Sequence, residues 1–375
     1  MQNLFRSLFF TSFLGIFIFN PIPSFAQNSD IQEQREATLE DERDRAQQLQ
    51  DLKQKPKTAQ EVLEMLKAKA EQRLKEKRYK QLRQTKISAG MTYGHQTNPA
   101  SAQNDTEKGD WVYDENFSMK WVPGFTDRLS GDFGYSFYDQ NFSEQNDSLD
   151  SENHTIGGSL KYYGFKSGKI LVEPGIKYEW TLYPFAAASA FEQTRAFMKL
   201  TYYLTNAWST GGEFEYSVKE YDKAVGRDTS GNNTSAHRED IKHSFDVWVK
   251  RQFGKYSVKL REKSFLNNSN DDYQDYYDYD SHRGYITLTG SFLKDNKLFV
   301  STTSDYEFKR YFNRPATSTT NARKDHIWTH NLYLSYPINK ILSLNYSFTF
   351  KESTSNAAAG EFKDVANKIG FSLNF

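Results

Sequence analysis

An alternation of apolar and polar residues runs from Lys86 to the last residue, Phe375. Successive side chains of a β-strand point to opposite faces of a sheet, so this period predicts strands with one apolar and one polar face. Phe214/Tyr216/Val218 and Leu342/Leu344/Tyr346 are clear examples. We count fourteen such segments, most of about ten residues or more. The chain is therefore expected to be all-β over residues 86–375.

Composition supports a sheet with one wet face. Aromatic residues make up 16% of the chain, although its mean hydropathy is −0.80. Disordered chains are equally polar but poor in aromatic residues. Lysine and arginine total 48, as do aspartate and glutamate, so no basic excess indicates a nucleic-acid partner. The chain has no cysteine, which excludes disulfides, zinc thiolates and a lipid anchor on cysteine.

The first 26 residues differ from the rest. Arg6 precedes an apolar run from Leu8 to Phe19, proline breaks that run, and Ser24-Phe25-Ala26 has the pattern of a cleavage site. These features predict a secretory signal peptide, residues 1–26, because the apolar run is short for a membrane span of about 20 residues. The alternative is an uncleaved anchor.

Residues 27–85 have the composition of a helix, rich in Gln, Glu, Lys, Arg, Leu and Ala and without glycine. Pro56 divides them, and Thr58 with Glu61 forms a capping-box pattern at a restart. Three interpretations stay open: a solvated helix or linker, a short coiled coil or partner-binding helix, and a helix folded into the barrel as a plug.

The connections between segments differ in length. Long polar connections lie at residues 98–110, 140–153, 222–238, 267–281, 313–323 and 353–360, whereas the alternate ones are short, such as Gly254-Lys255. Short turns on one side and long loops on the other are typical of bacterial outer-membrane barrels, and only closure leaves no strand edge unpaired in lipid. We expect a closed up-and-down antiparallel transmembrane barrel of about 14 strands, with residues 27–85 as a helical periplasmic extension.

The last strand must keep its pattern to the end, because it closes the barrel against the first. The segment Lys368-Ile369-Gly370-Phe371-Ser372-Leu373-Asn374-Phe375 also resembles the C-terminal signal of outer-membrane barrel proteins. The resemblance rests on Gly370, Phe371, Leu373 and Phe375, and Leu373 departs from it, since an aromatic residue is more usual there. It implies recognition by the barrel-assembly machinery.

The first strand, from Ala89 to Pro99, resembles the opening strand of a loose group of porin-type barrels. That group includes barrels from exopolysaccharide gene clusters and the barrel of surface lipoprotein assembly modifiers. The modifiers also have a long helical-repeat domain before the barrel. Here only about sixty residues precede the barrel and they contain no repeat.

The polar face carries most of the charge. Basic residues concentrate on one segment and acidic residues on two others. A charged, water-filled interior is what a diffusion pore uses to orient polar solutes. The alternative is that the charges satisfy one another inside a narrow barrel, and about fourteen strands permit both. We predict these charged residues to line the pore: Lys120, Lys161, Glu173, Lys177, Glu179, Lys199, Glu213, Glu215, Lys219, Lys242, Asp246, Lys250, Lys259, Arg261, Lys263, Asp305, Glu307 and Lys309.

Candidates for chemistry are few. His330 falls on the face opposite Asn331 and Tyr333, with no serine placed beside it, so we expect a histidine at the membrane interface and no enzyme. The loop at residues 271–280 could hold Ca²⁺ through oxygen ligands or contact glycans, but lacks EF-hand spacing. A solvated loop is the default, and we expect no cofactor. The loop's five carboxylates are Asp271, Asp272, Asp275, Asp278 and Asp280.

The sequence therefore predicts a porin-like outer-membrane channel for polar or charged small solutes, with saccharides among the candidates. One alternative is an export or assembly barrel for a polysaccharide or surface protein, with the periplasmic helix binding a partner. Another is a structural or adhesive barrel that acts through its loops. Expected partners are outer-membrane lipid and the barrel-assembly machinery, with a periplasmic protein as a further partner in the alternative in which residues 27–85 bind one.

Overall fold

The computed structural model describes residue 64 and residues 85–99, 109–126, 128–143, 147–165, 169–293, 297–316 and 321–375. The predicted signal peptide, residues 1–26, lies outside the described residues. So does the predicted helical segment, residues 27–85, apart from Glu64, which is helical and exposed, and Thr85, which begins the first strand. Within the described part of the chain, no helix is long and apolar enough to cross a bilayer.

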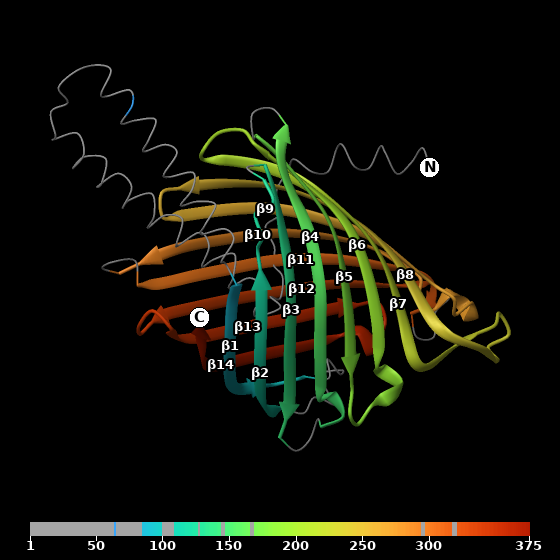
Figure 1. Cartoon of the computed structure of the whole chain (residues 1–375). Coiled ribbons are helices and arrows are strands. Elements are labelled where there is room, and N and C mark those ends of the chain that lie inside the picture. The colour runs from blue at the N-terminus through green and yellow to red at the C-terminus, as the bar shows by residue number, and fades with distance from the viewer. Residues whose placement is uncertain are drawn as a thin grey trace.

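The described chain forms fourteen strands and four short 3₁₀ helices (Figure 1). The strands are β1 (Thr85–Gln96), β2 (Asp110–Trp121), β3 (Leu129–Phe142), β4 (Ser151–Phe165), β5 (Ile170–Leu182), β6 (Phe191–Tyr203), β7 (Trp208–Arg227), β8 (Asn233–Phe253), β9 (Tyr256–Ser269), β10 (Tyr279–Phe292), β11 (Leu298–Pro315), β12 (Ala322–Pro337), β13 (Leu342–Ser355) and β14 (Phe362–Asn374). The 3₁₀ helices are η2 (Asp147–Leu149), η4 (Ala187–Ser189), η5 (Tyr273–Asp275) and η7 (Ala358–Gly360).

Each strand pairs antiparallel with its neighbours in the chain, and β1 pairs with β14, so the sheet closes into a barrel. This confirms the predicted closed antiparallel barrel of fourteen strands. The closing register runs from Ser88 opposite Asn374 to Gln96 opposite Ala366. The Phe375 N–H donates to the Ile87 carbonyl at 2.9 Å. Pairing therefore continues to the last residue, which is why the alternation does too.

Glycine allows β1 and β14 to approach closely. A Cβ on Gly370 would lie 2.0 Å from the Met91 carbonyl oxygen, and one on Gly94 would lie 1.9 Å from that of Asn367. Real side chains do not make such contacts, so neither position accepts one without a shift of the backbone. Gly370 therefore has a packing role at the closing strand pair, in addition to its place in the predicted assembly signal.

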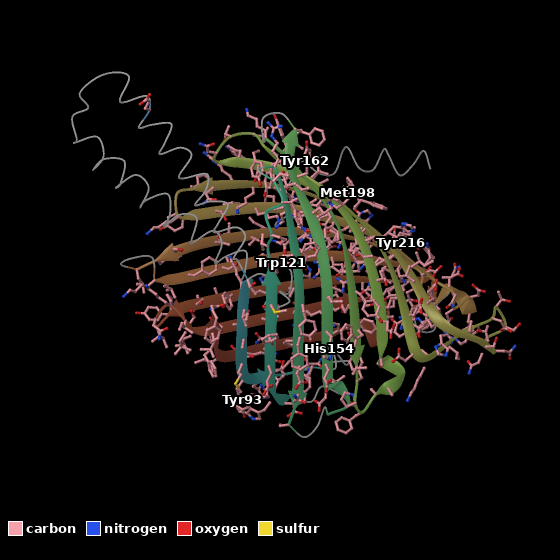
Figure 2. The ribbon with its side chains drawn as sticks, in the orientation of Figure 1. Tyr93, Trp121, His154, Tyr162, Met198 and Tyr216 are labelled. Atoms are coloured by element: carbon pink, nitrogen blue, oxygen red, sulfur yellow. The ribbon has the colours of Figure 1, made fainter. Side chains whose placement is uncertain are left out.

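The outer face of the barrel is apolar and exposed. It includes Tyr93, Trp121, Tyr162, Met198 and Tyr216, which Figure 2 labels, and large side chains such as Ile176 remain 57% exposed. An exposed apolar band around a closed barrel is the surface that lipid covers in outer-membrane proteins.

Aromatic and histidine rings stack along part of this outer face. The ring centroids of Tyr93 and Trp111 lie 5.1 Å apart, and those of His154 and Trp180 lie 4.7 Å apart. His330 lies 5.6 Å from Phe350. Rings that are apolar on their faces and polar at one edge suit the boundary between membrane and water. His330 faces outward as predicted, since its register partners Ser304 and Phe350 are outer-face positions.

The longest connection predicted from sequence was wrong in part. Residues 222–227 belong to β7 and residues 233–238 to β8, so only residues 228–232 form the turn. Strands β2, β3, β4, β9, β10, β11, β12 and β13 also extend into predicted loops, but by fewer residues. Beyond the apolar band of the outer face a hairpin still needs its backbone hydrogen bonds, but neither of its faces needs apolar side chains. Polar composition at residues 222–238 therefore did not exclude strand.

The two ends of the barrel differ. The connections after the odd-numbered strands share one end, which we call the long-loop end, and those after β1, β3, β5 and β9 are longer than any connection at the other end. Both termini of the barrel and short turns such as Gly254-Lys255 share the other, the short-turn end. In Figure 1 the β7–β8 hairpin projects at the right, away from the C-terminus.

Candidate functional site

The interior face follows from the strand register. Residues directly opposite one another in neighbouring strands point to the same side of a sheet. Since the exposed apolar residues face outward, the alternate residues face inward. All eighteen charged residues predicted to line the pore lie on this inner face. One row of register partners crosses seven strands: Glu173, Lys199, Glu213, Asp246, Lys263, Arg283 and Glu307.

Many interior charges neutralise one another across neighbouring strands. Asp132 accepts Lys161 at 2.7 Å and Lys120 at 3.0 Å. Arg283 reaches Asp305 at 2.8 Å and Glu307 at 3.5 Å, although Arg283 was absent from the sequence prediction. Further pairs join Lys199 to Glu173, Lys263 to Glu215, Arg195 to Glu179 and Arg261 to Asp246. For these residues, the alternative that interior charges satisfy one another holds.

Interior lysines on several strands instead contact aromatic rings, and we call the four on strands β7 to β11 the cation wall: Lys219, Lys242, Lys259 and Lys309. The ammonium of Lys219 lies 3.5 Å from the Phe191 ring centroid, and that of Lys309 lies 3.7 Å from Tyr279. Lys242 lies 3.9 Å from Phe265 and Lys259 lies 5.1 Å from Trp248. In the described residues no salt bridge joins any of the four to a carboxylate. An aromatic ring attracts a cation without cancelling its charge.

Three of the cation-wall lysines, Lys219, Lys242 and Lys309, line a cavity of about 330 Å³. The cavity lies at the long-loop end, where β7, β8, β10 and β11 end or begin. Its lining contains cationic, tyrosine and amide side chains with a single carboxylate and no aliphatic side chain. The lining residues are Gln193, Lys219, Tyr221, Arg238, Asp240, Lys242, Asn267, Tyr277, Tyr279, Lys309, Tyr311 and Arg314.

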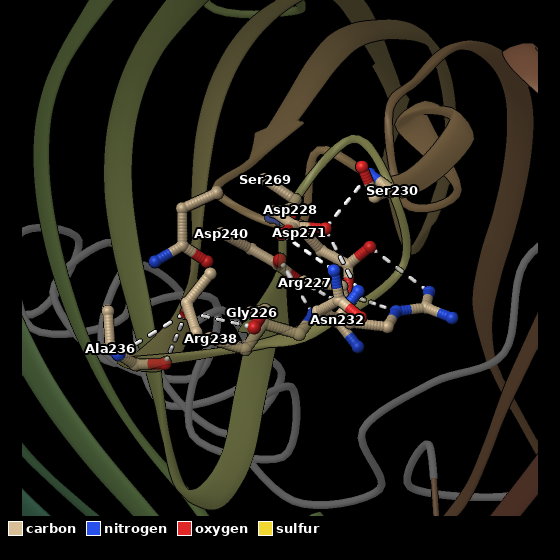
Figure 3. A network of polar contacts seen from close by, with 12 residues as sticks. Gly226, Arg227, Asp228, Ser230, Asn232, Ala236, Arg238, Asp240, Ser269 and Asp271 are labelled. Atoms are coloured by element: carbon tan, nitrogen blue, oxygen red, sulfur yellow. Dashed lines mark hydrogen bonds and ion pairs between the residues drawn. The ribbon is translucent and has the colours of Figure 1, made fainter.

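A polar network fixes the hairpin above this cavity (Figure 3). Arg227 donates twice to Asp271, at 2.8 and 3.0 Å. Arg238 donates twice to Asp240, at 3.0 and 2.6 Å. Two parallel bonds from a planar guanidinium fix orientation as well as position. The Arg227–Asp271 pair therefore holds the β7–β8 hairpin against the loop between β9 and β10, whereas the Arg238–Asp240 pair orients two side chains of β8.

The five loop aspartates do not converge on one point. Asp271 binds Arg227, Asp280 binds Arg310 at 2.7 Å, and Asp278 accepts the Ser269 N–H at 2.7 Å. Asp275 accepts the Asn313 amide, and Asp272 is exposed. In the described part of the chain, no group of three or more His, Cys, Asp or Glu residues is arranged to hold a metal ion.

A second interior cluster lies across the closure of the barrel, and we call it the closing seam: Asp114, Thr92, Tyr138, Gln140 and Lys368. Asp114 is 2% exposed and accepts four hydrogen bonds. Its donors are Lys368 Nζ at 2.7 Å, Thr92 Oγ1 at 2.6 Å, Tyr138 OH at 2.9 Å and Gln140 Nε2 at 3.0 Å. One carboxylate thus connects β14, β1, β2 and β3.

The closing seam was missed from sequence. Asp114 and Lys120 lie an even number of positions apart along β2, so the alternation places both on the inner face. Its partner Lys368, however, is 254 residues away in the chain. Lys368 crosses β1 at Gly94, its register partner, where no side chain obstructs the inner face. Only the register of β14 against β1 shows this contact.

No protein-family model matches the sequence, and the search of curated proteins finds no relative. Similar solved structures include an outer-membrane channel from Pseudomonas putida F1, with 10% identity, a TM-score of 0.41, and coverage of 77% of this chain and 95% of that one. OprB from Pseudomonas putida has 9% identity, a TM-score of 0.42, and coverage of 78% and 93%. The OccK2 structure from Pseudomonas aeruginosa has 12% identity, a TM-score of 0.38, and coverage of 78% and 99%. At 9–12% identity this similarity concerns the fold alone.

Proposed function

We propose that this protein is an outer-membrane channel for polar or charged small solutes. The observation that carries the proposal is the cation wall: charged groups on the inner face of a closed barrel that lie over rings and, in the described residues, form no salt bridge with a carboxylate. Interior charges that served only to pack the barrel would be expected to pair, as they do around Asp132 and Arg283. Ring-held cations keep a positive potential that attracts anionic solutes.

The eighteen interior charges are proposed to line the path of the solute. The neutralised pairs shape the wall, while Lys219, Lys242, Lys259 and Lys309 give it a net positive character on the side formed by β7 to β11. Saccharides are included among the solutes because the cavity at the long-loop end combines tyrosine rings with hydrogen-bonding groups.

The placement in the envelope is part of the proposal. Residues 86–375 form the barrel in outer-membrane lipid, residues 1–26 are removed on export, and residues 27–85 extend into the periplasm as a helical segment or linker. The exposed apolar outer face supports contact with lipid. Gly370, Phe371, Leu373 and Phe375 are proposed to be read by the barrel-assembly machinery before β14 pairs with β1.

Two measurements test the proposal. A folded barrel in the outer-membrane fraction is expected to migrate differently on gels before and after heating. In planar bilayers the purified protein is expected to give conductance steps with anion preference at low salt, where charges are least screened. A variant without residues 27–84 controls for a plug. The absence of steps from both forms contradicts the channel, and the export, assembly and adhesive alternatives then take precedence.

A further inference from the structure

The cavity at the long-loop end gathers three of the four cation-wall lysines, Lys219, Lys242 and Lys309, together with Arg314. We propose that this cavity binds the carboxylate-bearing ring of an acidic saccharide, which then enters the channel. The entry of the saccharide into the channel rests on the proposed function, whereas its binding to the cavity does not. The binding itself is a property of the cavity.

The charge of the cavity is unbalanced. Five cationic side chains line it, against one carboxylate, Asp240. Asp240 is already bound by Arg238 through two hydrogen bonds. The other four cations have rings as partners: Arg314, for example, lies 3.9 Å from Tyr276 and 5.1 Å from Tyr311. An entering carboxylate therefore finds four cations that form no salt bridge within the described chain. Charge-assisted hydrogen bonds are among the strongest available to it.

The rings of the cavity are held in place before a ligand arrives. The Arg238 guanidinium lies between Tyr221 and Tyr277, at 4.4 and 3.2 Å from their centroids. Tyr221 OH donates to Asp240 at 3.3 Å, and Asn267 Nδ2 donates to the Tyr277 carbonyl at 3.0 Å. Lys309 lies between Tyr279 and Tyr311, at 3.7 and 4.8 Å. Preorganised groups lose little entropy on binding, which favours affinity.

The lining also indicates the rest of the ligand. Pockets for hydrocarbon ligands are lined mainly by apolar side chains, and this one has no aliphatic residue. A sugar ring presents both C–H faces, which pack on tyrosine rings, and hydroxyls, which bond to amides such as Gln193 and to tyrosine OH groups. A carboxylate on that sugar accounts for the cations. An acidic saccharide satisfies all three kinds of lining group at once.

The test measures binding to the full-length folded protein in detergent by titration calorimetry, with digalacturonate as the probe. Lactose is the neutral comparison and benzoate is the aromatic acid without hydroxyls. We expect digalacturonate to bind at least about tenfold more tightly than either comparison, and more weakly as salt is raised, because the contacts are charge-assisted.

Lys309→Gln is expected to weaken digalacturonate binding about tenfold. Arg310→Gln is the matched control: Arg310 is the next residue of β11, faces outward and pairs with Asp280. Lys219→Gln is a second test variant if Lys309→Gln does not fold, as judged by its migration before and after heating. Benzoate binding as tight as that of digalacturonate would contradict a saccharide as the ligand. Equal affinities of Lys309→Gln and wild type for digalacturonate would contradict this cavity as the binding site.

These results are separable from the channel proposal, because calorimetry needs no conduction. Digalacturonate binding by a protein that gives no conductance steps contradicts the channel but supports the site. Conductance steps from a protein that does not bind digalacturonate support the channel and contradict the site.

Discussion

The closing seam and the cation wall are both polar regions of the inner face, yet they use charge in opposite ways. At the closing seam the buried Asp114 carboxylate meets a lysine and three neutral donors, so its charge is matched. At the cation wall, lysines lie against rings, and in the described residues no carboxylate pairs with them. The first arrangement stabilises the closed barrel, and the second leaves a positive potential in the interior.

The difference has a physical basis. Removing one partner of a buried ion pair costs about 3–5 kcal/mol, because the other charge is left buried without compensation. A cation over an aromatic ring gains about 0.5–2 kcal/mol, and its loss leaves no buried charge behind. Substitutions at the closing seam should therefore reduce stability, whereas substitutions at the cation wall should change selectivity and binding.

The largest effect is expected from Asp114→Ala. This change leaves the Lys368 ammonium without its carboxylate and removes the acceptor for three further donors, so the free energy of unfolding should fall by about 3 kcal/mol or more. Urea unfolding in lipid vesicles, followed by tryptophan fluorescence, measures it. The double variant Asp114→Asn with Lys368→Met should recover part of the loss. A loss from Asp114→Ala no larger than that from Lys309→Gln would contradict the contrast between the two regions.

A smaller effect is expected from Gly370→Ala at the strand pair that closes the barrel. The added Cβ lies 2.0 Å from the Met91 carbonyl oxygen, so β14 must shift from β1, at a cost of about 1–3 kcal/mol. Gly284→Ala in β10 is the control, because a Cβ there has no atom within 4 Å. The yield of heat-modifiable barrel measures the effect. Equal yields from the two variants would show that the close approach at Gly370 does not limit closure.

The third prediction separates neutralised from ring-held charge on a single strand. Lys259→Gln removes a cation that lies over Trp248 and should reduce anion preference, while stability changes by less than about 1 kcal/mol. The double variant Arg261→Gln with Asp246→Asn removes a neutral pair and should leave selectivity nearly unchanged. Reversal potentials at low salt, where screening reaches about 30 Å at 0.01 M, measure both. Reversal potentials that shift by the same amount in the two variants would show that ring-held and paired cations contribute equally to selectivity.

Sequence reasoning predicted the faces of the strands because a period of two leaves only one choice. Glu213, Lys219 and Lys259 follow from parity alone. Parity does not reveal which partner a charge meets. Lys259 and Arg261 lie on the same face of the same strand and look alike in sequence, but Trp248 lies against the first and Asp246 against the second.

Two further features required the three-dimensional arrangement. Inward aromatic rings such as Phe191, Tyr221 and Trp248 were not recognised, since an aromatic residue in a barrel strand suggests the lipid face. The cavity at the long-loop end draws residues from six strands and a loop. Its tyrosines lie within or close to connections that were predicted to be polar loops. The sequence therefore predicted the barrel and its charged lining but not the cavity.

The smallest effect concerns Asp228 in the turn between β7 and β8. Its carboxylate accepts the backbone N–H groups of Asn232 and Ser230, each at 2.9 Å, and the bond from Asn232 is the main reason that the pKa of Asp228 lies below its ordinary value. A lowered pKa means that the ionised form stabilises the turn above the unfolded-state pKa of about 3.9, and that this contribution is lost as the pH falls through the folded-state value. At about pH 6 the amides of residues 230 and 232 should therefore exchange hydrogen more slowly in wild type than in Asp228→Asn, and the difference should shrink by about pH 2.5, where wild type is also protonated. A difference that persists unchanged at the lower pH would show that the substitution acts through something other than the charge of Asp228.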